Sequence, residues 1–142
     1  MATTVNNTTS NSRITIIFDA AGALDGNGPA KGTGNTESDV YIDNTVYHNI
    51  RSHTEIDANV HALQWNSTTN TGELEYIDNR ENESLSSFPQ WATNVVIRCE
   101  AQDSWQTAYD NAMAGDADSQ ANATSTANTA RDNYLTAHSI TY

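Results

Sequence analysis

The sequence predicts an α+β fold, in which a small antiparallel β-sheet of hairpins is followed by a C-terminal helical hairpin. Short runs of β-branched and aromatic residues alternate with polar residues in the first part of the chain, and polar turns separate them. In the last third, apolar and small residues recur every three or four positions. We therefore expect a polar arm at 1–12, a β-hairpin domain at 13–88 and a helical region at 89–142.

The composition fits one domain with a modest core. The chain has 142 residues, of which 37% are hydrophobic. Asn, Thr and Ser make up about a third of the chain, and these residues favour turns over helix interiors. Stabilisation by partner subunits would suit such a chain.

The charge disfavours two classes of partner. The net charge is -12 with six basic residues, and binding to phosphate requires clustered Lys and Arg. Anionic membrane surfaces are disfavoured for the same reason, and no run is long enough to span a bilayer. We expect no nucleic acid and no membrane partner. A basic partner or a cation would be attracted, unless the acidity serves solubility alone.

The first strand is expected at 13–18. The segment 1–12 has no apolar stretch and little positive charge, so it predicts a polar arm and not a secretory signal. In "RITIIF", Ile14, Ile16 and Phe18 share one face. A long glycine-rich connection, 19–38, follows this strand, and its length indicates a functional or draped loop.

Residues 40–50, "VYIDNTVYHNI", predict a hairpin with a three-residue loop at 43–45. Asn44 tolerates the left-handed conformation that such a loop requires. The loop would match apolar residues on one face and tyrosines on the other. The expected pairs are Ile42 with Val46, Val40 with His48, and Tyr41 with Tyr47.

Residues 60–76, "VHALQWNSTTNTGELEY", predict a second, half-buried hairpin. His61, Leu63 and Trp65 share one face of its first strand, and Leu74 and Tyr76 share one face of its second. Pairing Trp65 with Leu74, or a slip of two residues from it, puts these side chains on the same side. Gly72 can supply a positive φ in the turn, and Glu73 and Glu75 point to the wet face.

A helix is expected from Trp91 to about Met113, although "NVVIRC" within it is also strand-like. Pro89 suits the first turn, and Gly115 with Asp116 ends the pattern. Core packing is the first interpretation for Trp65, Trp91 and Trp105; stacking on sugar rings is the other. The residues that recur at helical spacing are Ile97, Ala101, Trp105, Ala108 and Ala112, with Tyr109 beside them.

A last helix is expected from about Ala117 to Ala137. Many of its residues are poor helix formers, so it needs packing, either back on the preceding helix or across an oligomer. Small residues allow close approach at such a seam. The candidate oligomer seam consists of Ala123, Ala127, Ala130 and Tyr134.

The sequence carries no recognisable catalytic or metal-binding motif, so we expect no enzyme, no cofactor and no metal. His48, His53, His61 and His138 form no HExxH or HxH arrangement. "DGNG" at 25–28 is similar to the start of a calcium loop, but Thr36 stands at its twelfth position. The one cysteine, Cys99, lies among apolar residues and predicts a buried small hydrophobe.

Two quoted stretches resemble a module of small structural or tail-fibre-region proteins of tailed bacteriophages, particularly those of marine and cyanobacterial hosts. They are "VYIDNTVYHNI" and "IDANVHALQWNSTTNTGELEYIDNRENESLSSFPQW", and the resemblance covers about residues 38–91. The N-terminal strand with its glycine-rich loop and the Ala/Asn/Thr-rich end do not match it. No catalytic residue follows from this resemblance.

The resemblance implies a virion structural protein of the tail fibre, baseplate or capsid, synthesised in the host cytoplasm. Its partners would be other virion proteins, and a homo-oligomer is expected. Two alternatives stay open: a tail-fibre assembly chaperone, and a carbohydrate-binding adhesion module with exposed aromatic residues on one face.

Overall fold

The computed structural model describes residues 13–18, 37–51, 56, 59–76 and 80–141. The expected arm at 1–12 and nearly all of the expected connection at 19–38 lie outside these residues, and so does the calcium-like segment 25–28. The chain divides into two compact units between Val96 and Ile97, inside helix α3 (Gln90–Met113). This division lies eight residues after the expected domain boundary at 88/89. Each unit is described by itself.

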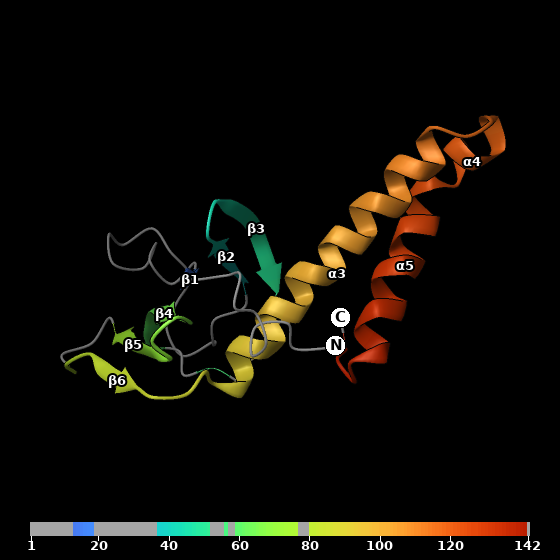
Figure 1. Ribbon diagram of the computed structural model, residues 1–142. Coiled ribbons are helices and arrows are strands. Elements are labelled where there is room, and N and C mark those ends of the chain that lie inside the picture. Colours follow the sequence, from blue (N-terminus) through green and yellow to red (C-terminus); the bar gives the residue numbers. More distant parts are fainter. Residues whose placement is uncertain (1–12, 19–36, 52–55, 57–58, 77–79, 142) are drawn as a thin grey trace. The chain divides into compact units, whose positions relative to one another are not determined.

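The first unit contains an antiparallel sheet, as the sequence predicts, and this sheet has six strands (Figure 1). In space the strands follow the order β3-β2-β1-β4-β5-β6, so the N-terminal strand lies in the middle. Their bounds are β1 Arg13–Phe18, β2 Glu37–Ile42, β3 Thr45–Arg51, β4 Val60–Asn66, β5 Thr71–Tyr76 and β6 Glu83–Leu85.

One face of the sheet forms the core. Ile14, Ile16 and Phe18 are buried on one face of β1, which confirms the expected alternation. The first two turns of α3 supply further buried residues, and the rings of Phe18 and Trp91 lie 5.6 Å apart. The main buried side chains contributed by the other strands and by these helical turns are Val40, Ile50, Leu63, Trp65, Leu74, Ala92, Val95 and Val96.

The 40–50 hairpin has a register different from the expected one. Asp43 and Asn44 form a two-residue turn, in which Asp43 takes the left-handed conformation with φ 52°. The Asp43 N–H donates to the Arg13 carbonyl at 3.0 Å, and the Arg13 N–H donates to Asp43 Oδ1 at 3.1 Å. These two bonds join the turn to β1. The observed pairs, which replace the three predicted ones, are Ile42 with Thr45, Tyr41 with Val46, and Val40 with Tyr47.

A β-bulge in β3 changes which of its side chains face the core beyond the bulge. The register shifts between Ser38 and Val40, where Asn49 has φ 57° and donates its N–H to Asp39 Oδ1 at 3.1 Å. A bulge inserts one extra residue and so changes which residues face the core. Ile50 returns to the buried side, opposite Ser38.

The 60–76 hairpin follows the predicted pairing. Leu63 lies opposite Leu74 and Trp65 lies opposite Gly72, which is the slip of two residues from a Trp65–Leu74 pair. The expected turn role of Gly72 is wrong, because Gly72 belongs to β5 and Asn70 takes the positive φ, at 55°. A second register shift, between Val60 and Ala62, places His61 at a bulge.

The helical part has one long helix and a broken one. Helix α3 runs from Gln90 to Met113, so the strand-like "NVVIRC" is helical. The last helix, expected as one element, is instead α4 (Ala117–Ala121) and α5 (Ala123–Ala137). Asn122 separates them, and its side chain donates to the Asp118 carbonyl at 2.9 Å, a local bond of the kind that competes with helix hydrogen bonding.

In the second unit, α5 folds back along α3, as one of the two predicted arrangements (Figure 1). A small core of Ile97, Ala101 and Leu135 lies between them, with Tyr134 and Ile140 packed against it. None of the helices in the described part of the chain is long and apolar enough to cross a membrane.

Candidate functional site

The outward face of the sheet is the main candidate for a functional surface. Residues directly opposite one another on neighbouring strands form a line that crosses the whole sheet. We call this line the outer row; it consists of Val46, Tyr41, Thr15, Gln64, Glu73 and Ser84.

One end of the outer row is apolar and lies at a sheet edge. Tyr41 and Val46 are 37% and 40% exposed, and in the described part of the chain Met113 is the other exposed large hydrophobic residue. Val46 belongs to β3, which is one of the two outermost strands of the sheet that the described residues form. Beside this pair, His48 Nδ1 lies 3.3 Å from Asp39 Oδ1, so the acid at the bulge holds both His48 and the Asn49 N–H.

The other end of the outer row is polar. Glu73 and Glu75 lie on the outer side, as predicted, and both are hydrogen-bonded there. Gln64 Nε2 donates to Glu75 Oε2 at 2.7 Å, and Asn82 Nδ2 donates to Glu73 Oε1 at 3.2 Å. Among the described residues, the second oxygen of each carboxylate accepts no hydrogen bond.

An open cleft of about 540 Å³ lies at this polar end. Its walls come from four strands, β1, β4, β5 and β6, and none of the described residues that line it is aromatic. The residues that line it are Arg13, Gln64, Asn66, Thr71, Gly72, Glu73, Ser84 and Leu85.

The turn between β4 and β5 is held by the side chain of Asn66. Asn66 Oδ1 accepts the N–H groups of Thr68 and Thr69, at 2.9 and 3.3 Å. The hydroxyls of Thr69 and Thr71 lie 2.7 Å apart. Two lining residues of the cleft, Asn66 and Thr71, are therefore fixed by the turn that they flank.

The predicted core residues of the sheet occupy two environments. Leu63, Trp65 and Leu74 are buried, and Trp65 packs edge-on against Phe88 with the ring centroids 5.3 Å apart. Tyr76 is half-buried: its hydroxyl donates to Glu83 Oε1 at 2.6 Å, and the Arg80 guanidinium lies 4.1 Å from its ring centroid.

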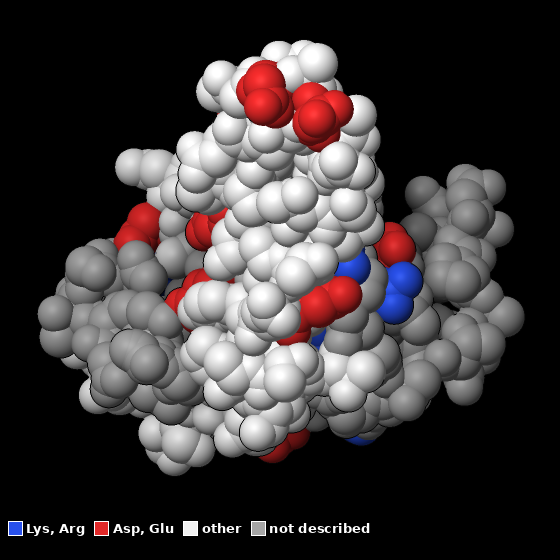
Figure 2. Space-filling model, turned by 90° about the vertical axis from the view of Figure 1, so that its right-hand side faces the viewer, with Lys and Arg blue, Asp and Glu red and all other residues white. Residues whose placement is uncertain are grey.

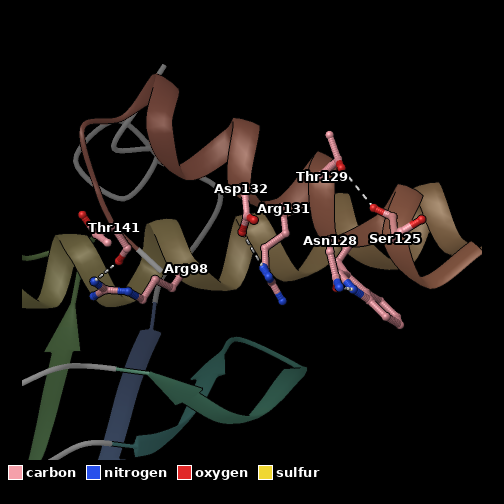
Figure 3. Close-up of polar contacts among 8 residues, drawn as sticks. Arg98, Ser125, Asn128, Thr129, Arg131, Asp132 and Thr141 are labelled. Carbon is pink, nitrogen blue, oxygen red and sulfur yellow. Dashed lines mark hydrogen bonds and ion pairs between the residues drawn. The ribbon is translucent and has the colours of Figure 1, made fainter.

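Trp105 and Tyr109, which were also predicted to pack in the core, are only half-buried. Their rings stack in parallel, 5.0 Å apart. Trp105 Nε1 donates to Asn128 Oδ1 at 2.8 Å; Asn128 is labelled in Figure 3. The hairpin of two helices has little interior, so these large rings lie along its side and not inside it.

The candidate oligomer seam is used inside one chain. Ala123 and Ala127 are buried in the single chain, whereas Ala130 and Tyr134 are half-buried. The Tyr134 hydroxyl donates to Glu100 Oε1 of α3 at 2.6 Å. Burial, together with this bond to Glu100, raises the pKa of the Tyr134 phenol well above its ordinary value. The stripe therefore joins helices of one chain.

Two further contacts close the helical unit (Figure 3). An Arg98 guanidinium nitrogen donates to the Thr141 carbonyl at 3.0 Å, which holds the segment after α5 against α3. Arg131 Nε lies 3.0 Å from Asp132 Oδ1. The exposed residues of α4 and α5 are mostly Ser, Thr, Asn and Ala. In Figure 2 acidic side chains lie at the top of the helical unit, and the surface directly below them is largely uncharged.

The Cys99 thiol is buried, as predicted. Burial raises its pKa, and the negative charges of Asp103 and Glu100 add to this effect. A thiol held in its neutral form is a poor nucleophile, because the thiolate is the reactive species. Cys99 therefore acts as a packing residue.

The described histidines, His48, His61 and His138, do not come together at a metal centre. Among the described residues, no group of three His, Cys, Asp or Glu side chains is placed to hold a metal ion. His53 lies outside those residues. His138 stacks on Tyr134 with the ring centroids 4.5 Å apart.

Comparison with known proteins adds no relative. No protein-family model, no curated protein and no solved structure matches the chain.

Sequence reasoning missed the cleft residues Arg13, Asn66, Thr71 and Ser84. Each of these side chains faces outward, and alternation along the strands indicates this. Residues two positions apart on a strand share a face, and so do residues directly opposite one another on neighbouring strands. Finding the cleft also required the strand order, which places β1 beside β4.

Proposed function

We propose that this chain is a structural component of a tailed bacteriophage particle, in the tail fibre, the baseplate or a capsid-associated layer, and that it acts by protein–protein assembly. The observation that carries the proposal is the exposed apolar pair Tyr41 and Val46 beside the edge strand β3. The resemblance over about residues 38–91, which runs from β2 to the start of α3, supports the same class.

The two edges of the sheet differ in how well they can accept a neighbour. The β6 strand has only three residues, and short edge strands protect a sheet from further pairing. The β3 strand has seven residues and contains no Lys or Pro. Its bulge at Asn49 distorts the second half, so an added strand would find regular strand geometry only in the first half, around Val46.

The exposed pair Tyr41 and Val46 forms apolar surface that a partner at this edge could bury. Large apolar side chains that lie together on a surface commonly mark contacts with other proteins. A strand added beside β3 would cover Val46 and reduce the exposure of Tyr41. We infer that the partner is another virion protein or a second copy of this chain.

Substitution of Val46 tests this proposal. In a phage that encodes the chain, Val46→Lys should lower the amount incorporated into particles, because a charge would occupy the buried centre of the contact. Thr124→Lys, on the exposed side of α5, adds the same charge elsewhere and should be incorporated normally. Equal incorporation of both variants, with both folded by circular dichroism, would remove β3 from the assembly contact.

The chaperone alternative is distinguished by where the protein is found. A tail-fibre assembly chaperone binds during assembly and then leaves, so it would be abundant in infected cells and absent from particles. Under that alternative, Val46→Lys would reduce fibre assembly without changing the protein content of the finished particle.

A further inference from the structure

The cleft on the outer face has the chemistry of a binding site. Two adjacent lines of outward residues build it: Arg13 lies opposite Asn66, which lies opposite Thr71, and beside them Gln64 lies opposite Glu73, which lies opposite Ser84. Neighbouring strands are about 4.8 Å apart, so each line spans about 10 Å, which is the length of two sugar rings.

Arg13 is the distinctive residue of this cleft. Its backbone N–H and carbonyl bind Asp43, but among the described residues its guanidinium makes no ion pair and no hydrogen bond. The chain as a whole has three acidic residues for each basic one, with 18 Asp and Glu against 6 Lys and Arg. Among the described lining residues the Arg13 guanidinium is the one cationic group, and Glu73, the one acidic group there, lies two strands away. The guanidinium can therefore pair with an anionic group from outside.

The rest of the lining favours hydroxyl groups as ligands. Gln64 and Asn66 supply carboxamides, Thr71 and Ser84 supply hydroxyls, and Glu73 keeps one carboxylate oxygen available beyond its bond to Asn82. Such planar amide and carboxylate groups pair with adjacent hydroxyls of a sugar ring. Leu85 is the one large apolar residue of the lining, so a hydrophobic ligand finds little surface there.

The lining also argues against a neutral sugar. Neutral sugars are commonly held by stacking on an aromatic ring, and none of the described lining residues is aromatic. Trp65, the nearest predicted candidate for stacking, is buried on the other face. Binding would have to come from charge-assisted hydrogen bonds, which are about twice as strong as neutral ones.

We propose that this cleft binds an acidic saccharide, with its carboxylate on the Arg13 guanidinium and its hydroxyls on Gln64, Asn66, Thr71 and Glu73. The Arg13 fork is suited to two parallel hydrogen bonds with a carboxylate. Glu73 is two strands away from Arg13, so it meets the hydroxylated part of the ligand and not its charge. This inference does not depend on the location of the chain in a particle.

Titration of the full chain with tetragalacturonate tests the proposal. Backbone amide signals of Asn66, Thr71 and Gly72 should shift in a nitrogen–proton correlation spectrum, and calorimetry should give the affinity. Arg13→Gln should weaken binding by about tenfold or more, as expected for loss of a charged hydrogen-bond partner. The matched control, Arg131→Gln, removes a cation from α5 and should bind as the wild type does.

Two further probes decide which chemistry the cleft selects. The methyl-esterified tetrasaccharide has the same hydroxyls without the charge, and it should bind much more weakly; equal binding would overturn the role of Arg13. Tetraglutamate carries carboxylates without the sugar hydroxyls, and equal binding of this peptide would overturn the saccharide assignment. Signal shifts confined to residues outside the cleft would overturn the site itself.

Arg13→Lys keeps the proposal testable if Arg13→Gln fails to fold. The lysine preserves the charge and the backbone bonds to Asp43, but it lacks the planar fork. Its affinity should lie between those of the wild type and the glutamine variant. An affinity equal to that of the wild type would contradict two-point recognition of a carboxylate.

Discussion

Trp65 of β4 lies directly opposite Gly72 of β5, and its indole occupies the space that a side chain at Gly72 would need. A β-carbon at Gly72 would lie 2.7 Å from Trp65 Cε3 and 2.4 Å from the Gln64 carbonyl oxygen. The glycine is therefore required by close approach and not by an unusual backbone conformation.

Gly72→Ala should destabilise the sheet unit by about 1–3 kcal/mol, the usual cost of forcing extra volume into a packed site. One of the two clashing atoms belongs to the backbone, so side-chain movement alone cannot relieve the clash. Guanidinium unfolding followed by tryptophan fluorescence measures this loss. In the control, Gly115→Ala, the new carbon would meet the Ser119 side chain at 3.0 Å or more, and the loss should be smaller. Equal losses would contradict the account.

Trp65→Ala should cost about 3–5 kcal/mol, because the indole is buried and packs against Phe88. The pair can also be tested together. If the indole causes part of the Gly72→Ala penalty, then that penalty should fall in the Trp65→Ala background. Strict additivity of the two losses would show that the residues do not interact. A melting temperature unchanged by Trp65→Ala would contradict its place in the core.

Ser139→Gly should stabilise the helical unit by about 0.5–1 kcal/mol. Helix α5 ends with the Ile140 N–H donating to the Leu135 carbonyl at 2.9 Å and the Ser139 N–H donating to the Thr136 carbonyl at 3.0 Å. In this termination Ser139 has φ 61°, a conformation that glycine adopts without cost. Ser125→Gly, inside α5, should lower stability instead. A loss in both variants, measured by thermal melting, would refute the strain at Ser139.

The Tyr134–Glu100 bond should make the helical unit less stable at high pH. Burial first, and then the bond to Glu100, raise the pKa of the Tyr134 phenol, so the folded protein holds this proton more tightly than the unfolded chain does. The resulting stability is complete below the unfolded pKa of about 10 and is lost as the pH rises above it.

Tyr134→Phe isolates this effect, because the other tyrosines remain. Unfolding free energies of both proteins should be compared from about pH 8 to about pH 11, on either side of the phenol's ordinary pKa. The wild type should lose more stability than the variant over this range. In Glu100→Gln, which keeps an acceptor but removes the negative charge, the loss should lie between them. Parallel pH curves for the wild type and Tyr134→Phe would contradict the raised pKa.

The sequence was sufficient for those elements whose periodicity is clean. In β1 the alternation of Ile14, Ile16 and Phe18 fits one face of a strand, and both of its neighbours pair in register with it. The pairing of Leu63 with Leu74 could also be predicted, because a slip by one residue would turn one of the two leucines away from the core. These are the positions at which burial alone decides the register.

The sequence was insufficient where backbone conformation decides the register. In the 40–50 hairpin, apolar matching favoured Ile42 with Val46, but the left-handed conformation of Asp43 and its bonds to Arg13 produce a two-residue turn. The bulge at Asn49 then restores the burial of Ile50. Neither the left-handed turn residue nor the bulge changes the pattern of apolar residues in the sequence, so periodicity could not reveal them.

The candidate site, too, could be predicted from the sequence only in part. Outward facing of Glu73 and Glu75 followed from alternation within one strand. The cleft could not be predicted, because it needs Arg13 of β1 beside Asn66 of β4, and those residues are far apart in the sequence. The break of the last helix at Asn122 likewise depends on a side-chain bond to Asp118 and not on the pattern of apolar residues.

Quantitative mass spectrometry of purified phage particles tests the central claim most directly. The account predicts that the chain is present in particles at a fixed copy number, and that number would distinguish a tail component from a capsid component. Absence of the chain from purified particles, together with abundance in infected cells, would contradict a structural role and favour an assembly chaperone.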